Sequence, residues 1–332
     1  MTAVFTAALE QTLEDRFLLI EEIARGGMAT IYKARDLQVE GTFVVVKVPH
    51  PIFGSGIGSW SMFQREQEIG CQLDHPNIVK FVPLAVHQHR PYLVMQYVPG
   101  STLAERLQAQ GLLPEREALT IAQQVVSALK HMHERGFVHY DLKPENIILQ
   151  PDGSICLIDL GLSHAVTSRF SWVGAMPAIG SRGYVAPEQI KRQRGRKSVD
   201  IYGVGALLYE LLTGKHPFPD DDPFVIGSAR LVGDPPAPRD LNPDISKQVE
   251  EIVLRALRRN PNQRYESMAA LKSDLDCPQG VAVTGLRDHL RPVTRWRRGM
   301  RLARYIALAA FLPIALQVIL FFFLWRNLSH KH

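Results

Sequence analysis

The hydrophobic period of the chain changes at Pro99-Gly100, and this change limits the fold more than any other feature. Before it, the apolar residues of 17–48 form three strand-like runs, the first two separated by Gly26-Gly27. From Thr102 onward, apolar residues recur at i, i+3 and i+4 until Gly136, which is typical of amphipathic helices. The sequence therefore predicts an α+β chain with a small β-rich lobe followed by a larger, mainly helical lobe.

Further elements are expected in the first lobe. The three runs predict an antiparallel sheet, and a helical pattern follows at Ser61 to Leu73. Two more strands are predicted over 78–86 and 91–98, on either side of a turn at His87 to Arg90. With 332 residues, 46% of them hydrophobic, the chain is long and apolar enough to bury a substantial core.

Cysteine and charge content exclude several classes of protein. The three cysteines lack the spacing of a disulfide framework or a zinc site, which favours a reducing cytosol. The net charge of +5 is local, because seven arginines crowd 287–304. These arginines adjoin an uncharged segment, so nucleic-acid binding is a poor interpretation and we expect no nucleic-acid partner.

That uncharged segment is Tyr305 to Trp325. As a helix it would be about 31 Å long, which matches the hydrocarbon thickness of a bilayer. The sequence predicts one transmembrane helix here, with the arginines on the cytoplasmic side and the rest of the protein in the cytosol. About seven residues follow Trp325, too few for an extracytoplasmic domain of the usual size.

The segment "GFVHYDLKPENIIL" at 136–149 is the strongest candidate for chemistry. Asp141, Lys143 and Asn146 supply a carboxylate, a cation and an amide oxygen, which phosphoryl transfer requires near the attacking hydroxyl, the phosphate and the magnesium ion. Asp159 ends a strand that the Asp152-Gly153 turn pairs with the strand after Asn146. A magnesium site beside Asn146 is one reading, and an exposed strand-end aspartate is the other.

Two upstream features fit the same chemistry. Gly26 and Gly27 allow backbone amides to approach phosphate, although such a turn is more often only a hairpin. Lys47 lies in a strand so apolar that it needs an anionic partner, and Glu66 on the following helix is the obvious one.

These features are, in chain order, the glycine turn, Lys47, the segment 136–149 and Asp159. Together they resemble the protein kinase family, and specifically the bacterial-type Hanks (eukaryotic-like) serine/threonine kinases. The resemblance covers roughly Arg16 to Leu275. It is reinforced by "HPNIV" at 75, "GYVAPEQ" at 183, "SVDIYGVGALLYELLTGKHPF" at 198 and "NPNQRYESMAALKSDL" at 260. It implies a bilobal protein kinase fold and transfer of the γ-phosphate of ATP to Ser/Thr hydroxyls of proteins.

The resemblance also implies residue roles. Lys47 would contact the ATP phosphates and pair with Glu66, Asp141 would orient and deprotonate the substrate hydroxyl, and Lys143 would steady the γ-phosphate. Asn146 and Asp159 would hold Mg²⁺, with Mn²⁺ as the alternative ion. Residues expected around ATP are Ile23, Ala24, Arg25, Gly26, Gly27, Met28, Ile31, Val45, Lys47, Met95, Gln96 and Val98. Structural roles fall to Ser181 and Asp200, which would bond the catalytic loop, and to a Glu188–Arg264 ion pair.

Some positions depart from the family pattern. Tyr140 replaces an arginine that usually anchors a phosphorylated activation loop, so we expect catalysis not to require phosphate on Thr167, Ser168 or Ser171. Ala24 and Ala29 replace two glycines of the glycine-rich loop, and Val45 replaces a small alanine. These changes sustain one alternative, a pseudokinase that serves as a membrane-tethered ATP-binding or scaffold module. His87, His89, His131 and His133 are expected to be surface histidines.

The predicted organisation follows from these boundaries. The kinase N-lobe with its N-terminal extension covers 1–98, the C-lobe 99–276, an Arg-rich juxtamembrane linker 277–304, the transmembrane helix 305–325 and a short tail 326–332. Partners would be Ser/Thr-containing proteins and membrane lipids, the latter through 305–325 and the arginines, with dimerisation as a further option.

Overall fold

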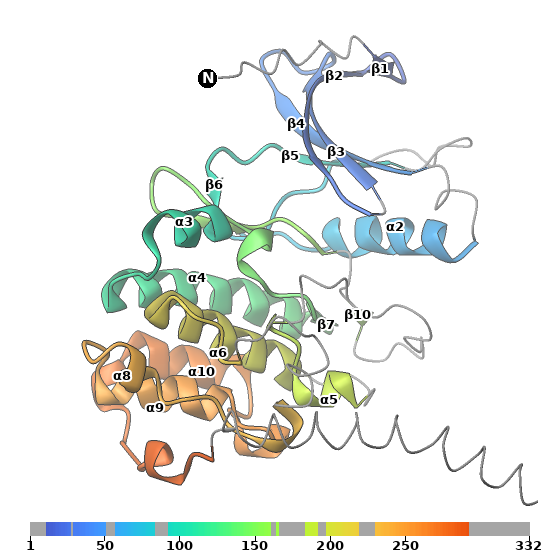
Figure 1. Cartoon of the computed structure of the whole chain (residues 1–332). Helices are drawn as coiled ribbons and strands as arrows, with labels where there is room; N and C mark the ends of the chain where they lie inside the picture. Colours follow the sequence, from blue (N-terminus) through green and yellow to red (C-terminus); the bar gives the residue numbers. More distant parts are fainter. Residues whose placement is uncertain are drawn as a thin grey trace, which may run out of the picture.

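The computed structural model describes residues 11–27, 29–50, 57–83, 92–160, 164–165, 183–191, 197–218 and 230–291. Figure 1 shows a small lobe of strands above a larger lobe of helices. This two-lobed arrangement is the one that the family resemblance implied. Several predictions concern residues outside the described ranges: Met28, His87, His89, Thr167, Ser168, Ser171, Ser181 and the helix over 305–325.

The first lobe contains a five-stranded antiparallel sheet in the order β1-β2-β3-β4-β5, with helix α2 beside it (Figure 1). Its elements are β1 (Thr12–Leu13), β2 (Phe17–Arg25), β3 (Ala29–Asp36), β4 (Phe43–Pro49), α2 (Ile57–Gly70) and β5 (Leu93–Gln96).

The period-2 alternation of β4 separates a core face from a functional face. Val44 and Val46 are buried in a small cluster with Phe17, whereas Val45 and Lys47 point to the opposite side of the sheet. Because Lys47 is directly opposite Ile31 on β3, these side chains share that face. The apolar run "FVVVKV" therefore supplies both the core of the sheet and a lysine on its other side.

The second lobe begins after Gly100. Its strands are β6 (Ser101–Thr102), β7 (Phe137–Val138), β8 (Ile147–Leu149), β9 (Ile155–Leu157) and β10 (His164–Ala165). Its helices are α3 (Leu103–Gln110), α4 (Glu115–Glu134), η1 (Pro144–Asn146), α5 (Pro187–Ile190), α6 (Ser198–Thr213), α8 (Pro238–Leu241), α9 (Lys247–Ala256), η3 (Pro261–Gln263), α10 (Met268–Asp276), η4 (Pro278–Gly280) and η5 (Leu286–His289).

Helix α6 forms the centre of this lobe. Fourteen of its residues are buried, and it packs against α4 and α9. A helix that is hydrophobic on nearly every side requires neighbours all round it, unlike α4, whose buried residues form one stripe. The side chains that α6 carries near its N-terminus are consequently held in a rigid environment.

Two expectations in the first lobe need correction. The segment predicted as a strand over 78–86 contains isolated bridges at Ile78 and Phe81 in its described part rather than a strand. Pro83 has no amide hydrogen to donate to a ladder, and Ile78 pairs with Leu157 of the other lobe. The helix predicted over 61–73 runs from Ile57 to Gly70, where the ring of Phe81 lies too close for any side chain on Gly70.

The described part of the expected linker, 277–291, packs against the helical lobe. Glu251 of α9 accepts hydrogen bonds from the amide of Thr284 at 3.0 Å and from its hydroxyl. Arg287 pairs with Asp240 and, at 3.5 Å, with Glu250. A free linker therefore remains a prediction for 292–304 only.

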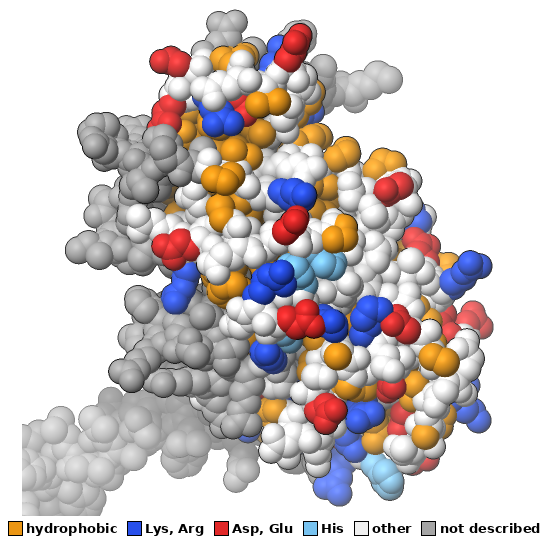
Figure 2. Space-filling model, turned by 180° about the vertical axis from the view of Figure 1, so that it is seen from behind, with side chains coloured by type: hydrophobic (Ala, Val, Ile, Leu, Met, Phe, Trp, Pro, Cys, Tyr) orange, Lys and Arg blue, Asp and Glu red, His pale blue; other side chains and the backbone are white. Residues whose placement is uncertain are grey.

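Surface charge on the helical lobe is mixed where it is described. Figure 2 shows Lys and Arg side chains interspersed with Asp and Glu on the face turned away from the view of Figure 1. Within the described ranges, no helix combines the length and apolar character needed to cross a bilayer.

Candidate active site

Lys47 connects the two lobes. Its Nζ donates to both carboxylate oxygens of Glu66 on α2 at 3.0 Å, as predicted, and to Oδ1 of Asp159 at 3.4 Å. Burial opposes the charge on Lys47, but the carboxylates of Asp159 and Glu66 outweigh it and raise the pKa of the ammonium. Lys47 is therefore a fixed positive charge at the junction of sheet and helical lobe.

Asp141 lies on the loop between β7 and β8, with two of its predicted partners. Lys143 Nζ is 3.0 Å from its Oδ2, and Asn146 Nδ2 donates to the Asp141 carbonyl at 3.0 Å and to Oδ2 at 3.3 Å. Because Nδ2 of Asn146 faces Asp141, its amide oxygen remains available as a ligand. The D-x-K-x-x-N spacing thus brings all three side chains together.

Asn146 is coupled to Asp159 through the β8–β9 hairpin. These strands pair as predicted, with Ile147 opposite Leu157, and the Ile158 amide donates to the Asn146 carbonyl at 3.0 Å. Asp159 follows directly, with 38% of its side chain exposed. An amide oxygen and a carboxylate at neighbouring positions form a donor set that suits a hard cation such as Mg²⁺.

A buried carboxylate supports the loop that carries Asp141. Asp200 of α6 accepts the amides of His139 and Tyr140, each at 2.9 Å, as predicted, and His133 Nε2 lies 2.7 Å from its Oδ2. Burial alone would raise the pKa of Asp200, but the hydrogen bonds and charges of His133 and His139 hold it below its ordinary value. The network keeps Tyr140 in a left-handed conformation, with φ of 67°.

The prediction of a surface histidine at position 133 is wrong. His133 is 4% exposed, because it stands one helical turn after Leu129 on the apolar stripe of α4. That spacing was the signal which could have revealed it. His131 is half-buried and stacks at a tilt on His75, with ring centroids 5.1 Å apart.

Four of the residues expected around ATP lie on the sheet face that carries Lys47: Ala24, Ile31, Val45 and Met95. Ala24 is opposite Ile31, and Val45 is opposite Met95, which is 5% exposed. Ile23 is 48% exposed, and Gly26 donates its amide to the Ala29 carbonyl at 2.9 Å. Arg25 pairs with Glu22 on the surface, and Gly27 has open space around it.

The backbone amides at and after the end of β5 differ in whether they already donate a hydrogen bond within the protein. The amide of Gln96 donates to the Lys80 carbonyl at 2.8 Å, and that of Tyr97 to the Phe43 carbonyl at 3.4 Å. The amide of Val98 has no backbone acceptor among the described residues. Of these three, Val98 is the position able to bond a ligand.

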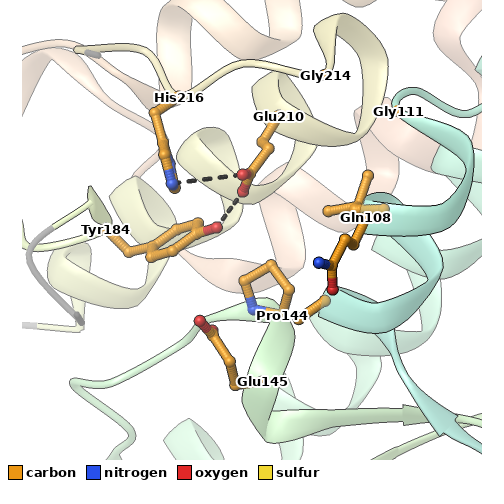
Figure 3. A pocket seen from close by; sticks show the side chains of 10 residues that line it. Gln108, Gly111, Pro144, Glu145, Tyr184, Glu210, Gly214 and His216 are labelled. Atoms are coloured by element: carbon orange, nitrogen blue, oxygen red, sulfur yellow. Dashed lines mark hydrogen bonds and ion pairs between the residues drawn. The ribbon is translucent and has the colours of Figure 1, made fainter. Parts of the chain in front are cut away.

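A pocket of about 300 Å³ opens beside the Asp141 loop (Figure 3). Tyr184 and His216 reach Glu210 of α6 from two sides: the Tyr184 hydroxyl donates to one carboxylate oxygen, and His216 Nε2 lies 3.4 Å from the other. Pro144 and Glu145 line the opposite wall. Sequence patterns did not indicate Tyr184, Glu210 or His216 as site residues, because the fold brings them together from segments distant in the chain.

The Glu188–Arg264 ion pair is present, as predicted. Arg264 Nη1 and Nη2 lie 2.6 and 2.8 Å from the two carboxylate oxygens, and both side chains are buried. This bidentate contact joins α5 to the segment after η3.

A lobe of antiparallel strands, a helical lobe, and a Lys–Glu–Asp cluster joining them define the protein kinase class. Comparison with known proteins agrees: residues 17–275 match the protein kinase domain. The chain belongs to the protein kinase family and is of the bacterial Hanks serine/threonine type.

Its relatives include serine/threonine-protein kinase PrkC of Bacillus subtilis, 35% identical over 79% of this chain and 40% of that protein. Another is serine/threonine-protein kinase PknB of Mycobacterium leprae, 32% identical over 79% of this chain and 43% of that protein. This chain therefore spans about two fifths of the length of these relatives.

Proposed function

We propose that this protein transfers the γ-phosphate of ATP to Ser/Thr hydroxyls of proteins, with Mg²⁺ or Mn²⁺. The observation that carries this proposal is the bridge from Glu66 through Lys47 to Asp159, because it aligns the sheet lobe with the Asp141 loop.

Each residue has a task in this scheme. Lys47 would hold ATP phosphates, and the Val98 amide would bond the adenine edge. Asn146 Oδ1 and the Asp159 carboxylate would hold the metal ion. When bound, this ion would neutralise part of the negative charge of the phosphates. Asp141 would orient the substrate hydroxyl and accept its proton, with Lys143 beside the transferred phosphate.

The glycine-rich loop does not argue for the pseudokinase alternative. Among the described residues, positive φ outside glycine occurs at Glu14, Asp15 and Tyr140, and not at Ala24 or Ala29. Alanine therefore imposes no left-handed strain at either position. Val45 adds bulk to the face that carries Lys47, and it is the one departure still expected to narrow the ATP site.

We also propose that a helix over 305–325 anchors the protein in a membrane, with the kinase domain in the cytosol. The absence of charge in that segment and the seven arginines before it support this arrangement. The arginines would add contacts to anionic lipid headgroups. Anchoring in the plane of a membrane would raise the local concentration of copies and so favour dimerisation.

The proposed transfer is tested with Asp159→Asn, and Asp152→Asn serves as a matched control on the same hairpin. Asp159 faces Lys47, whereas Asp152 accepts hydrogen bonds from Ser154 in the exposed turn. With labelled ATP and Mg²⁺, we expect Asp159→Asn to abolish phosphate incorporation and Asp152→Asn to retain it. Equal incorporation by the parent and Asp159→Asn would refute the proposal.

A further inference from the structure

Arg230 is a buried cation that the proposed chemistry does not use. Its relative exposure is 1%, which is unusual for a guanidinium. Burial lowers the pKa of Arg230, and such burial is costly unless the donors are satisfied. A residue kept at this cost needs a structural or functional reason.

The guanidinium of Arg230 binds the segment around Tyr184. Nη1 donates to the Val185 carbonyl at 2.8 Å, and Nη2 donates to the Gly183 carbonyl. The guanidinium carbon also lies 5.7 Å from the centre of the Phe218 ring. Because a planar fork holds two carbonyls on either side of one residue, it fixes the backbone at Tyr184.

The same segment is held from its other side by the pocket residues. The Tyr184 hydroxyl donates to Glu210, and the Tyr184 and His216 rings pack edge to face with centroids 5.1 Å apart. A side chain on Gly183 would come within 2.8 Å of the His216 ring. Residues 183–185 therefore lie between Arg230 and the wall of the 300 Å³ pocket.

Arg230 is itself anchored through Asp234, four residues later. Asp234 Oδ1 accepts from Arg259 Nε at 3.1 Å, and its Oδ2 accepts the Arg291 amide at 3.0 Å. The Asp234 amide in turn donates to the Arg291 carbonyl at 3.1 Å. Arg291 of the packed segment is thus bonded to Asp234, four residues after Arg230.

We propose that Arg230 is a positioning residue for the protein substrate: it fixes residues 183–185 so that the pocket beside the Asp141 loop keeps the shape that receives a substrate side chain. This inference rests on the proposed kinase function.

The test compares Arg230→Gln and Arg230→Lys with the parent, using the full chain and a mixture of Ser/Thr peptides at varied concentration. Glutamine removes the charge and three of the five N–H donors, and lysine keeps the charge without the planar fork. Arg255→Gln is the matched control, because Arg255 also lies over an aromatic ring, Tyr265, but is 48% exposed. KM for peptide, KM for ATP and kcat are measured for each protein.

We expect Arg230→Gln to raise the peptide KM by about tenfold or more, with the ATP KM within about twofold of the parent value. Arg230→Lys should lie between them, and Arg255→Gln should match the parent. If Arg230 served stability alone, its replacement would lower the melting temperature without raising the peptide KM relative to the ATP KM. A peptide KM for Arg230→Gln within about twofold of the parent would overturn the proposal, and if that variant does not fold, the same criterion applies to Arg230→Lys.

The rate of amide hydrogen exchange at 183–185 tests the positioning role of Arg230 independently of kinase activity. If the parent transfers no phosphate, the proposed function fails, but exchange at 183–185 still reports on positioning. We expect faster exchange there in both Arg230 variants and unchanged exchange in β4 and α2. Unchanged exchange at 183–185 would overturn the proposal whatever the activity.

Discussion

Asp200, near the start of α6, accepts three hydrogen bonds. Two come from the amides of His139 and Tyr140, and one comes from the His133 ring. Two of these bonds fix the backbone directly before Asp141. A carboxylate accepts on both oxygens, whereas an asparagine would turn an amide group toward one of the donors. The carboxylate of Asp200 therefore fixes the backbone of the catalytic loop by direct hydrogen bonds.

Replacing Asp200 with Asn should lower the free energy of unfolding by about 3 kcal/mol or more, because it leaves buried donors without a charged acceptor. Asp240→Asn is the matched control: Asp240 is 54% exposed and pairs with Arg287, so its loss should cost less than about 1 kcal/mol. Urea unfolding at neutral pH measures both. A loss below 1 kcal/mol for Asp200→Asn would contradict the assigned role.

The lowered pKa of Asp200 predicts how stability depends on pH. A carboxyl group with a folded pKa below its unfolded value of about 3.9 stabilises the fold above that pH, and this contribution disappears as pH falls through the folded pKa. Urea unfolding of the parent should therefore show falling stability below about pH 4, with a shallower fall in Asp200→Asn. An identical pH profile in the two proteins would show that Asp200 is not the group responsible.

For single residues, the sequence could predict a contact where motif spacing fixes it, or where a charged side chain in an apolar strand requires an opposite charge. Lys47 needed an anion, and Glu66 provides it; Asp200 and Arg264 contact the partners that the family pattern implied. It could not predict Arg230, because nothing in the sequence near 230 indicates that carbonyls at 183 and 185 lie within its reach. Such contacts depend on how α6 and the following segments pack.

The crossing of α6 and α9 depends on which glycine faces the neighbouring helix. A Cβ on Gly205 would lie 2.8 Å from Cβ of Ala256 and 3.1 Å from Cγ of Leu257, whereas a Cβ on Gly203 would meet Leu142 at 3.4 Å. Gly205 therefore lets the helices approach closely. Gly203 has room for a methyl group.

The two glycines predict opposite effects of alanine on the free energy of unfolding. Gly205→Ala should destabilise by about 1–3 kcal/mol, because the helices must separate. Gly203→Ala should be neutral or stabilise by up to about 1 kcal/mol, because alanine is the better helix former. Urea unfolding of the two variants side by side is the measurement. Equal effects would mean that the packing of α6 on α9 does not determine them.

Most elements could be predicted because hydrophobic period determines them. The strands before Val48, the β8–β9 hairpin and the helices after Thr102 are present. The prediction of a strand over 78–86 fails because Pro83 interrupts the apolar run, and because Ile78 pairs with Leu157 of the other lobe. A segment whose isolated bridges go to both lobes has no local signature in the sequence.

The whole molecule joins a kinase domain to an arginine-rich segment. Residues 277–291 pack against the helical lobe, and Arg291 is held there by Asp234. This docking could not be predicted, because its polar contacts go to Glu251, Asp240 and Glu250 on distant elements. If 305–325 spans a membrane, the kinase domain would be held near that surface by only the short segment between them.

The proposed topology places the kinase domain in the cytosol and 326–332 across the membrane. Seven arginines stand between 287 and 304, against Arg326 and Lys331 after the apolar segment, and basic flanks are retained on the cytoplasmic side. Tyr305 and Trp325 stand at the two ends of the segment, where amphipathic rings favour the headgroup region. The supply of ATP in the cytosol is an independent reason for this orientation.

Protease protection tests this topology. Protease added to intact cells or to sealed right-side-out vesicles should leave the kinase domain uncut, and permeabilisation should expose it. A chain that ends before Tyr305 is the control, and it should be recovered outside the membrane fraction, because the uncharged segment 305–325 supplies the anchoring energy. Digestion of the kinase domain without permeabilisation would show that the orientation is the opposite of the one proposed. Recovery of the shortened chain in the membrane fraction would show that the arginines, rather than 305–325, anchor the protein.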